Sequence, residues 1–200
     1  MKKILLASTF AIFAISSTAY SESATKDGAF IQVFGGAAFP SKQSFVITSD
    51  YSALPKPVGM YGLGIGNNFK NFSFSATVDR TELQFESTTL TTDSSTTTRF
   101  FTFLANAAYN FNTGTRFSPY FGAGAGFTLD SIAMSSDLHH HDNSFVWQVS
   151  AGAKYAIYTH LDIFADLRYR GMAESQSYKS LSSMTGGRFI MVATGLTYNF

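Results

Sequence analysis

The chain has 200 residues, with 14 Lys and Arg against 13 Asp and Glu. This near-neutral balance excludes the basic surface that nucleic-acid binding requires, and the lack of any cysteine excludes both a disulfide framework and a thiolate site. Its 21 Phe and 10 Tyr beside only 4 Pro favour strands over disorder.

The N-terminus has the pattern of a secretory signal peptide. Two lysines precede an apolar run over 4–16, which is shorter than the roughly 20 residues of a spanning helix. We expect a signal peptide over residues 1–21, cleaved after Ala19 or Ser21, followed by one domain over 22–200. The remaining chain then has 12 Lys and Arg (14 minus the two lysines) against 13 Asp and Glu, a formal charge of −1.

Segments of alternating apolar and small or polar residues fill the rest of the chain, and none shows a helical period. No stretch after the signal is apolar enough for a transmembrane helix, so any membrane span must be a strand. In the third segment the apolar phase shifts to Leu83 and Phe85, which indicates a bulge or the start of an aqueous rim. The eight expected strands are 28–37, 58–66, 72–85, 99–111, 119–128, 145–158, 161–173 and 190–200.

The connections between these strands alternate in length. Short links are expected at 67–71, 112–118 and 159–160, and long polar loops at 39–57, 87–97, 129–144 and 174–187. This alternation predicts an all-β fold, an eight-stranded antiparallel up-and-down transmembrane β-barrel in the outer membrane of a Gram-negative bacterium. Four long loops would lie outside the cell, and both termini in the periplasm. A soluble β-sandwich is the structural alternative, but it explains the terminal phenylalanine poorly.

Aromatic residues gather at the expected periplasmic strand ends, where a girdle should meet the lipid headgroups. The predicted girdle consists of Tyr109, Phe111, Tyr155, Tyr158, Tyr198 and Phe200.

Charged residues concentrate on the inward face of the sixth and seventh segments. If the short turn pairs Ile157 with Leu161, then Lys154 lies opposite Phe164 and diagonal to two aspartates. Ion pairs would then fill this part of the lumen. The predicted lumen ion-pair cluster is Lys154, Asp162, Asp166, Arg168 and Arg170.

The two arginines of this cluster extend the polar interior, because the same register places Arg168 opposite Ser150 and Arg170 opposite Gln148. A barrel of eight strands is only wide enough for side chains to fill. We therefore expect a plugged barrel rather than a broad pore.

Three stretches, 118–127, 147–155 and 161–170, carry a resemblance to a known group. The chain resembles the small outer-membrane β-barrel proteins of the opacity protein and surface antigen superfamily, which share their barrel with the membrane domain of OmpA. The resemblance implies a surface antigen whose outer loops serve adhesion, host or immune interaction, or envelope integrity. The expected partners are outer-membrane lipid and lipopolysaccharide, the barrel assembly machinery through the strand ending in Phe200, and a host-surface ligand bound by the loops.

Two local motifs invite other interpretations. The glycines of 62–66 and 122–126 lack the spacing of a nucleotide loop, so we interpret them as inward glycines that make room for large neighbours. A loop carries His139, His140, His141 and Asp142, whose imidazoles and carboxylate are possible metal ligands. Adjacent residues in one loop rarely form a closed site, so we expect a solvated loop, no metal and no cofactor.

An enzyme would need a nucleophile or activated water beside a base. The remaining histidine, His160, lies in a predicted periplasmic turn, and nothing orients the loop histidines toward Ser135, Ser136 or Asp137. We expect no catalysis. Besides a loop-displaying anchor, the open functional alternative is a small-solute or ion-conducting porin, suggested by the inward charges and glycines.

Overall fold

The computed structural model describes residues 27–40, 57–89, 92–133, 141–173 and 187–200. Within the strand tips, the side chains of 83–98, 130–133 and 141–142 are not described. Every described element is a strand. Among the described residues, no helix is long and apolar enough to cross a membrane. The strands are β1 Gly28–Pro40, β2 Val58–Phe69, β3 Phe72–Thr89, β4 Thr92–Asn110, β5 Phe117–Ala133, β6 His141–Tyr158, β7 Leu161–Met172 and β8 Arg188–Asn199.

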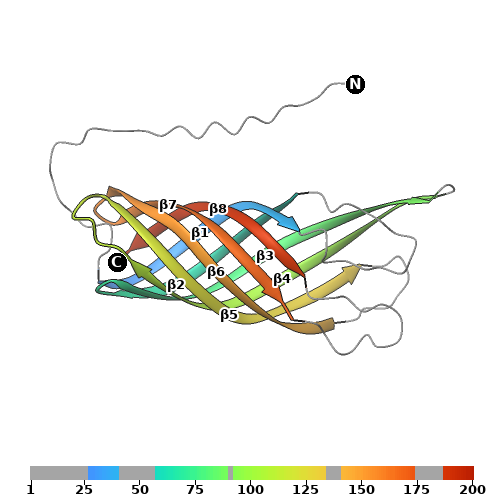
Figure 1. Cartoon of the computed structure of the whole chain (residues 1–200), viewed down its shortest axis with the longest axis horizontal. Helices are drawn as coiled ribbons and strands as arrows, with labels where there is room; N and C mark the ends of the chain where they lie inside the picture. Colours follow the sequence, from blue (N-terminus) through green and yellow to red (C-terminus); the bar gives the residue numbers. More distant parts are fainter. Residues whose placement is uncertain (1–26, 41–56, 90–91, 134–140, 174–186) are drawn as a thin grey trace, which may run out of the picture.

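The strands form one closed barrel in which each pairs antiparallel with its neighbours in sequence (Figure 1). Closure is made by β1 and β8, which pair from Phe30 with Asn199 to Pro40 with Phe189. Because closure leaves no free sheet edge, the fold is the predicted up-and-down barrel and not a β-sandwich. The shortest strands have 12 residues, which exceeds the roughly 9–11 residues of a tilted transmembrane strand.

The two ends of the barrel differ. We call the end with the connections 70–71, 111–116 and 159–160 the turn end; the C-terminal Phe200 also lies there (Figure 1). The opposite end is the loop end. At the turn end, Lys70 has a positive φ of 52°, and its backbone N–H donates to the Asp27 carboxylate at 2.5 Å. This contact stabilises a conformation that non-glycine residues seldom adopt.

One predicted long loop is wrong. Residues 87–89 and 92–97 belong to strands, because β3 and β4 continue as a paired ladder as far as Thr89 opposite Thr92. Threonine is a strong strand former, and this property outweighs the hydrophilic composition that suggested a loop. The resulting β3–β4 hairpin projects beyond the other strands at the loop end (Figure 1).

The register resolves two further expectations. Pairing of β3 with β4 runs without a shift, so the bulge suggested at Leu83 is wrong, and the alternative of an aqueous rim stays a prediction. A register shift occurs instead between Ala156 and Tyr158 in the pairing of β6 with β7. Tyr158, not Ile157, therefore pairs with Leu161.

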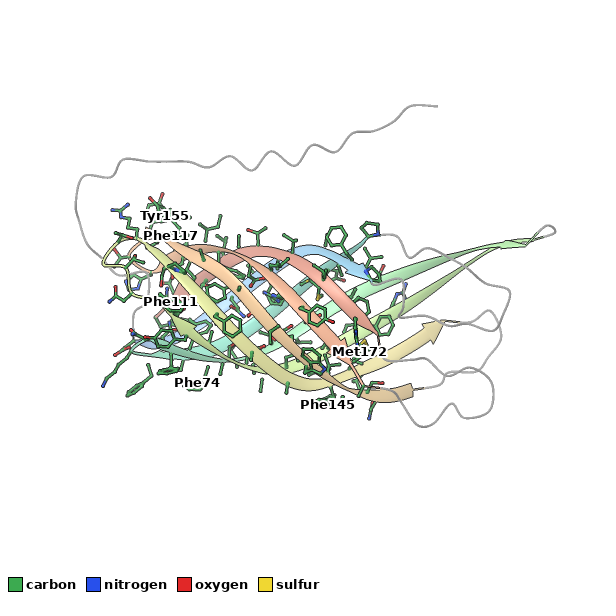
Figure 2. All side chains as sticks on the ribbon, in the orientation of Figure 1. Phe74, Phe111, Phe117, Phe145, Tyr155 and Met172 are labelled. Carbon is green, nitrogen blue, oxygen red and sulfur yellow. The ribbon has the colours of Figure 1, made fainter. Side chains whose placement is uncertain are left out.

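Apolar side chains lie on the outside of the barrel and polar side chains on the inside, the reverse of the arrangement in a soluble protein. Large hydrophobic residues cover the outside, including Ile65 at 64% and Leu63 at 58% exposure, while most buried polar groups line the lumen (Figure 2). The predicted packing role of the strand glycines is confirmed on β2, where a Cβ on Gly62 would lie 2.6 Å from the ring of Phe34. Large inward side chains of β1 therefore fill the space that these glycines leave.

Candidate functional site: the lumen and the outer wall

All five residues of the predicted lumen cluster lie inside the barrel, and each is at most 8% exposed. The predicted cross-strand pairs are present despite the shifted turn: Lys154 is opposite Phe164, and Arg170 is opposite Gln148. The bulge after Ala156 absorbs the extra residue of the turn, which restores the expected register along the rest of β6 and β7.

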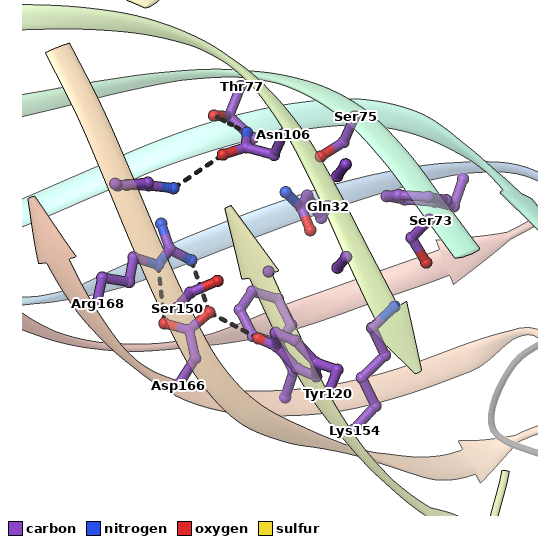
Figure 3. A pocket seen from close by; sticks show the side chains of 16 residues that line it. Gln32, Ser73, Ser75, Thr77, Asn106, Tyr120, Ser150, Lys154, Asp166 and Arg168 are labelled. Atoms are coloured by element: carbon purple, nitrogen blue, oxygen red, sulfur yellow. Dashed lines mark hydrogen bonds and ion pairs between the residues drawn. The ribbon is translucent and has the colours of Figure 1, made fainter. Parts of the chain in front are cut away.

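Asp166 occupies the middle of the lumen and accepts three hydrogen bonds. Arg168 donates to it from Nε at 2.8 Å and from an Nη at 3.0 Å, and the hydroxyl of Tyr120 donates at 2.7 Å (Figure 3). The Arg168 guanidinium also lies 4.4 Å from the ring centroid of Phe34. This bidentate, aromatic-backed pair is the geometry that arginine favours in buried sites.

Lys154 does not make the predicted pair with Asp166, because Arg168 and Tyr120 hold that carboxylate. Its ammonium instead lies 5.6 Å from the ring centroids of Phe30 and of Tyr120. The carboxylate of Asp162 acts electrostatically on this ammonium. Lys154 is therefore part of the predicted cluster, but aromatic faces provide its described contacts.

Arg170 makes an ion pair that crosses the lumen. Its two Nη atoms donate to the two carboxylate oxygens of Asp79 on β3 at 2.7 and 2.8 Å. The same guanidinium donates to Gln148 at 3.1 Å and to Thr102 at 3.3 Å. Since β3 and β7 are not neighbours in the sheet, this group ties opposite walls of the barrel together.

A chain of amides and hydroxyls crosses the lumen near the turn end. Asn199 donates to Asp162 at 2.8 Å and accepts from Asn68 at 3.3 Å; Asn68 in turn accepts from Ser73 at 2.6 Å. Asn110 then donates to Ser73 at 2.7 Å. We call these five residues the amide chain; it links strands β7, β8, β2, β3 and β4.

The loop end of the lumen is closed by apolar side chains instead. Met172 lies one inward position beyond Arg170, and Phe189 pairs with Arg170 across β7 and β8. We call this layer the apolar cap; it consists of Met60, Phe100, Met172, Phe189 and Met191. The sequence interpretation missed it because inward positions were expected to be polar.

Between the described side chains the lumen has little free space. A polar cavity of about 60 Å³ lies among Gln32, Ser75, Tyr120 and Lys154 (Figure 3). A second of about 10 Å³ lies between Arg170 and the apolar cap. Since one water needs about 10–15 Å³, the larger cavity is large enough for a few waters. The described lumen is thus filled by side chains between the amide chain and the apolar cap.

The predicted aromatic girdle residues all lie at the turn end; Figure 2 shows Phe111 and Tyr155 there, beside Phe117. Edge-to-face contacts join Tyr109 to Phe111 at 5.0 Å and Tyr198 to Phe200 at 5.3 Å. Their role at a membrane interface stays a prediction.

The other predicted candidates are only partly described. His139 and His140 lie outside the described residues, as do Ser135, Ser136 and Asp137. His141 and Asp142 belong to β6, where the backbone alone is described, so the metal question stays a prediction. His160 lies in the β6–β7 turn, with Nδ1 3.0 Å from the carbonyl oxygen of Asn199.

A group of charges on the outer wall was not predicted. We call Arg80, Glu82 and Arg99 the outer-wall cluster; Glu82 forms ion pairs with Arg80 and, at 3.4 Å, with Arg99. Arg80 lies between its cross-strand neighbours Tyr61 and Phe101, with ring centroids 5.9 and 5.6 Å from its guanidinium. Continuing the two-residue period of Phe74 and Val78 would have placed Arg80 and Glu82 on the outer face.

Comparison with known proteins identifies the type of barrel. The family described as outer membrane protein beta-barrel domain matches residues 7–200. The outer membrane protein PagN of Salmonella typhimurium is 30% identical over 80 residues, a match that covers 36% of this chain and 34% of PagN. The chain therefore matches about a third of the length of this curated relative.

Solved structures share the fold at low sequence identity. Neisserial surface protein A has a TM-score of 0.64 at 19% identity, with 86% of this chain and 97% of that chain covered. OprG of Pseudomonas aeruginosa has a TM-score of 0.58 at 14% identity, covering 90% and 99%. Ail, the attachment invasion locus protein of Yersinia pestis, was solved with the heparin analogue sucrose octasulfate; its TM-score is 0.55 at 14% identity, covering 88% and 100%.

Proposed function

Because the chain belongs to the outer membrane protein beta-barrel domain family, we propose that it is a non-conducting barrel that anchors surface-exposed segments in the outer membrane. These segments would serve adhesion, host or immune interaction, or envelope integrity. The observation that carries the proposal is the filled lumen, in which the apolar cap lies over Arg170 and the amide chain closes the other end.

Charge balance in the lumen supports an anchor over a pore. The buried ionisable side chains of the described barrel that carry charge are Lys154, Arg168 and Arg170 against Asp79, Asp162 and Asp166, three of each sign. A balanced interior leaves no excess charge to attract one ion type, and the apolar layer at the loop end disfavours water. A role as an anchor is therefore compatible with the barrel as it stands, whereas a pore would require the lumen to open.

The orientation follows the length of the connections. Outer-membrane barrels have short periplasmic turns and longer outer segments, so we place the turn end and both termini in the periplasm. The signal peptide over 1–21 would be removed on export, and the barrel assembly machinery would recognise β8 with its terminal Phe200. An epitope tag inserted within 174–186 should react with antibody on intact cells, whereas a tag within 111–116 should react only after lysis. The reverse pattern would refute the orientation.

For the interacting surface we propose the loop end, including the projecting β3–β4 hairpin (Figure 1). Host ligands are suggested by the complex of Ail with a heparin analogue, at the level of fold similarity alone. Deleting 87–94 and joining Glu86 to Ser95, which are paired, through a two-residue turn keeps the ladder intact. Bacteria carrying this variant should adhere less to epithelial monolayers and to immobilised heparin than wild-type cells.

The control for that deletion is folding, measured by the heat-dependent gel mobility of the variant. A folded variant whose producing cells adhere to both surfaces like wild-type cells would remove the hairpin from the proposed interface.

Conduction is the decisive test between the anchor and a porin. The pore alternative is favoured by the polar cavity of about 60 Å³ and the buried charges around it. Single-channel recording of the refolded mature protein in a planar bilayer should show no current steps, with folding verified by gel mobility in the same sample. Reproducible discrete steps would refute the closed-lumen proposal.

A further inference from the structure

We infer that the outer-wall cluster binds a phosphate group of lipid A, the phosphorylated glycolipid of lipopolysaccharide, in the outer leaflet. This inference rests on the proposed orientation, which puts the loop end in that leaflet. It assigns a lipid ligand to Arg80 and Arg99, two residues on the outer wall rather than in the lumen.

The depth of the cluster agrees with a headgroup site. Arg99 and Tyr109 lie on the same outer face of β4, with Tyr109 at the turn end. With about 3.4 Å per residue and a strand tilt of about 40°, their separation is roughly 25 Å along the membrane normal. Because this equals the height of the apolar band of such barrels, Arg99 falls at the opposite membrane interface.

The cluster has unused hydrogen-bonding capacity and excess positive charge. Two guanidinium groups share the single carboxylate of Glu82, so the cluster has a formal charge of +1. The Nε atom of Arg80 is buried and has no hydrogen-bond acceptor among the described residues, so a phosphate would meet Arg80 through its Nη atoms. Each guanidinium carries five N–H donors, and the ion pairs with Glu82 involve Nη2 of Arg80 and Nε of Arg99, so the other Nη atoms remain for a phosphate.

Aromatic side chains hold one of these guanidinium groups in place. Arg80 is 28% exposed and lies between Tyr61 and Phe101, while Arg99 is 50% exposed. Cation–π contact on both sides restricts the Arg80 side chain before any ligand binds, which reduces the entropy lost on binding. The arrangement is a fixed guanidinium beside a more mobile one, bridged by Glu82.

The direct test measures lipid binding by the full-length mature barrel in nanodiscs of zwitterionic phospholipid. Diphosphoryl lipid A is titrated against the wild type, Arg80→Gln and Arg99→Gln. Each substitution should weaken binding about fivefold, which corresponds to the ~1 kcal/mol that one arginine contributes at a membrane surface. Arg99→Lys should retain most of the affinity, since it keeps the charge.

The matched control is Arg188→Gln. Arg188 is an exposed arginine at the loop end of β8, on the opposite side of the closed barrel from β4. The Arg188→Gln variant should bind lipid A with wild-type affinity, and all variants should keep the heat-dependent gel mobility of a folded barrel. Equal binding by wild type, Arg80→Gln and Arg99→Gln would overturn the inference, as would equal loss in Arg188→Gln.

Two further arms identify the ligand chemistry. Dephosphorylated lipid A should bind the wild type no more tightly than diphosphoryl lipid A binds Arg99→Gln. Equal binding of both lipid forms by the wild type would overturn the phosphate assignment. Inorganic phosphate at millimolar concentration should not displace diphosphoryl lipid A; complete displacement would show that free phosphate suffices and overturn the lipid assignment. In a nanodisc both ends of the barrel are accessible, so the lipid-binding result does not depend on the orientation in the cell. A failure of lipid binding therefore leaves the tag-accessibility and conductance tests of the proposed function unaffected.

Discussion

The barrel carries arginines in two contrasting environments. Inside, Arg168 and Arg170 are at most 6% exposed, and each makes a bidentate pair with its own aspartate. On the outer wall, Arg80 and Arg99 share one glutamate and are 28% and 50% exposed. Full pairing inside allows charge to be buried, whereas incomplete pairing outside leaves charge for a ligand. The same residue type thus forms closed ion pairs in the lumen and an open ion-pair cluster on the outer wall.

The largest effect is expected from breaking the Arg170–Asp79 pair. Asp79→Asn or Arg170→Met should lower the free energy of unfolding by ~3–5 kcal/mol, because each leaves the other charge buried without its partner. Guanidinium unfolding of the barrel in lipid vesicles measures this change, with the fluorescence of Trp147, the single tryptophan of the chain, as the probe.

The double variant Asp79→Leu with Arg170→Met sharpens the comparison. Removing both charges should recover most of the lost stability, since apolar replacements of buried ion pairs are often neutral. A double variant as unstable as the sum of the two single variants would mean that the pair is not the source of the effect.

A smaller effect is expected for Tyr120→Phe. This change removes the hydroxyl that donates to Asp166 at 2.7 Å and leaves the two bonds from Arg168 in place. A hydrogen bond to a charged group contributes ~1.5–3 kcal/mol, so unfolding should be easier by about that amount in the same vesicle assay. Tyr158→Phe, at an exposed position of the turn end, provides the control and should unfold like the wild type.

The sequence was sufficient to predict the number of strands and the pairing of residues between adjacent strands. Alternation and turn length predicted eight strands, and the register of β6 and β7 placed Lys154 opposite Phe164 even though the turn itself was displaced by one residue. Threonine-rich composition misled at the β3–β4 hairpin, where strand propensity prevails over hydrophilicity.

Contacts between opposite walls of the lumen could not be predicted from the sequence. The partner of Arg170 is Asp79, 91 residues away on a strand that is not adjacent to β7. Which residues meet across a barrel depends on strand tilt and stagger, and neither follows from the period of a single strand. The apolar cap was missed for a different reason: the period of Phe101 and Phe103 on the outer face already puts Phe100 inward, but inward positions were expected to be polar.

The smallest stability effect should come from Glu82→Gln, which is the outer-wall counterpart of Asp79→Asn. Glu82 is 37% exposed, and ion pairs in such positions contribute ~1 kcal/mol or less, so the unfolding midpoint in vesicles should scarcely change. Lipid A affinity in nanodiscs should rise instead, because the formal charge of the cluster increases from +1 to +2. A stability loss as large as that of Asp79→Asn, with no gain in lipid binding, would place Glu82 and both outer arginines among the structural ion pairs and remove the distinction between the two environments.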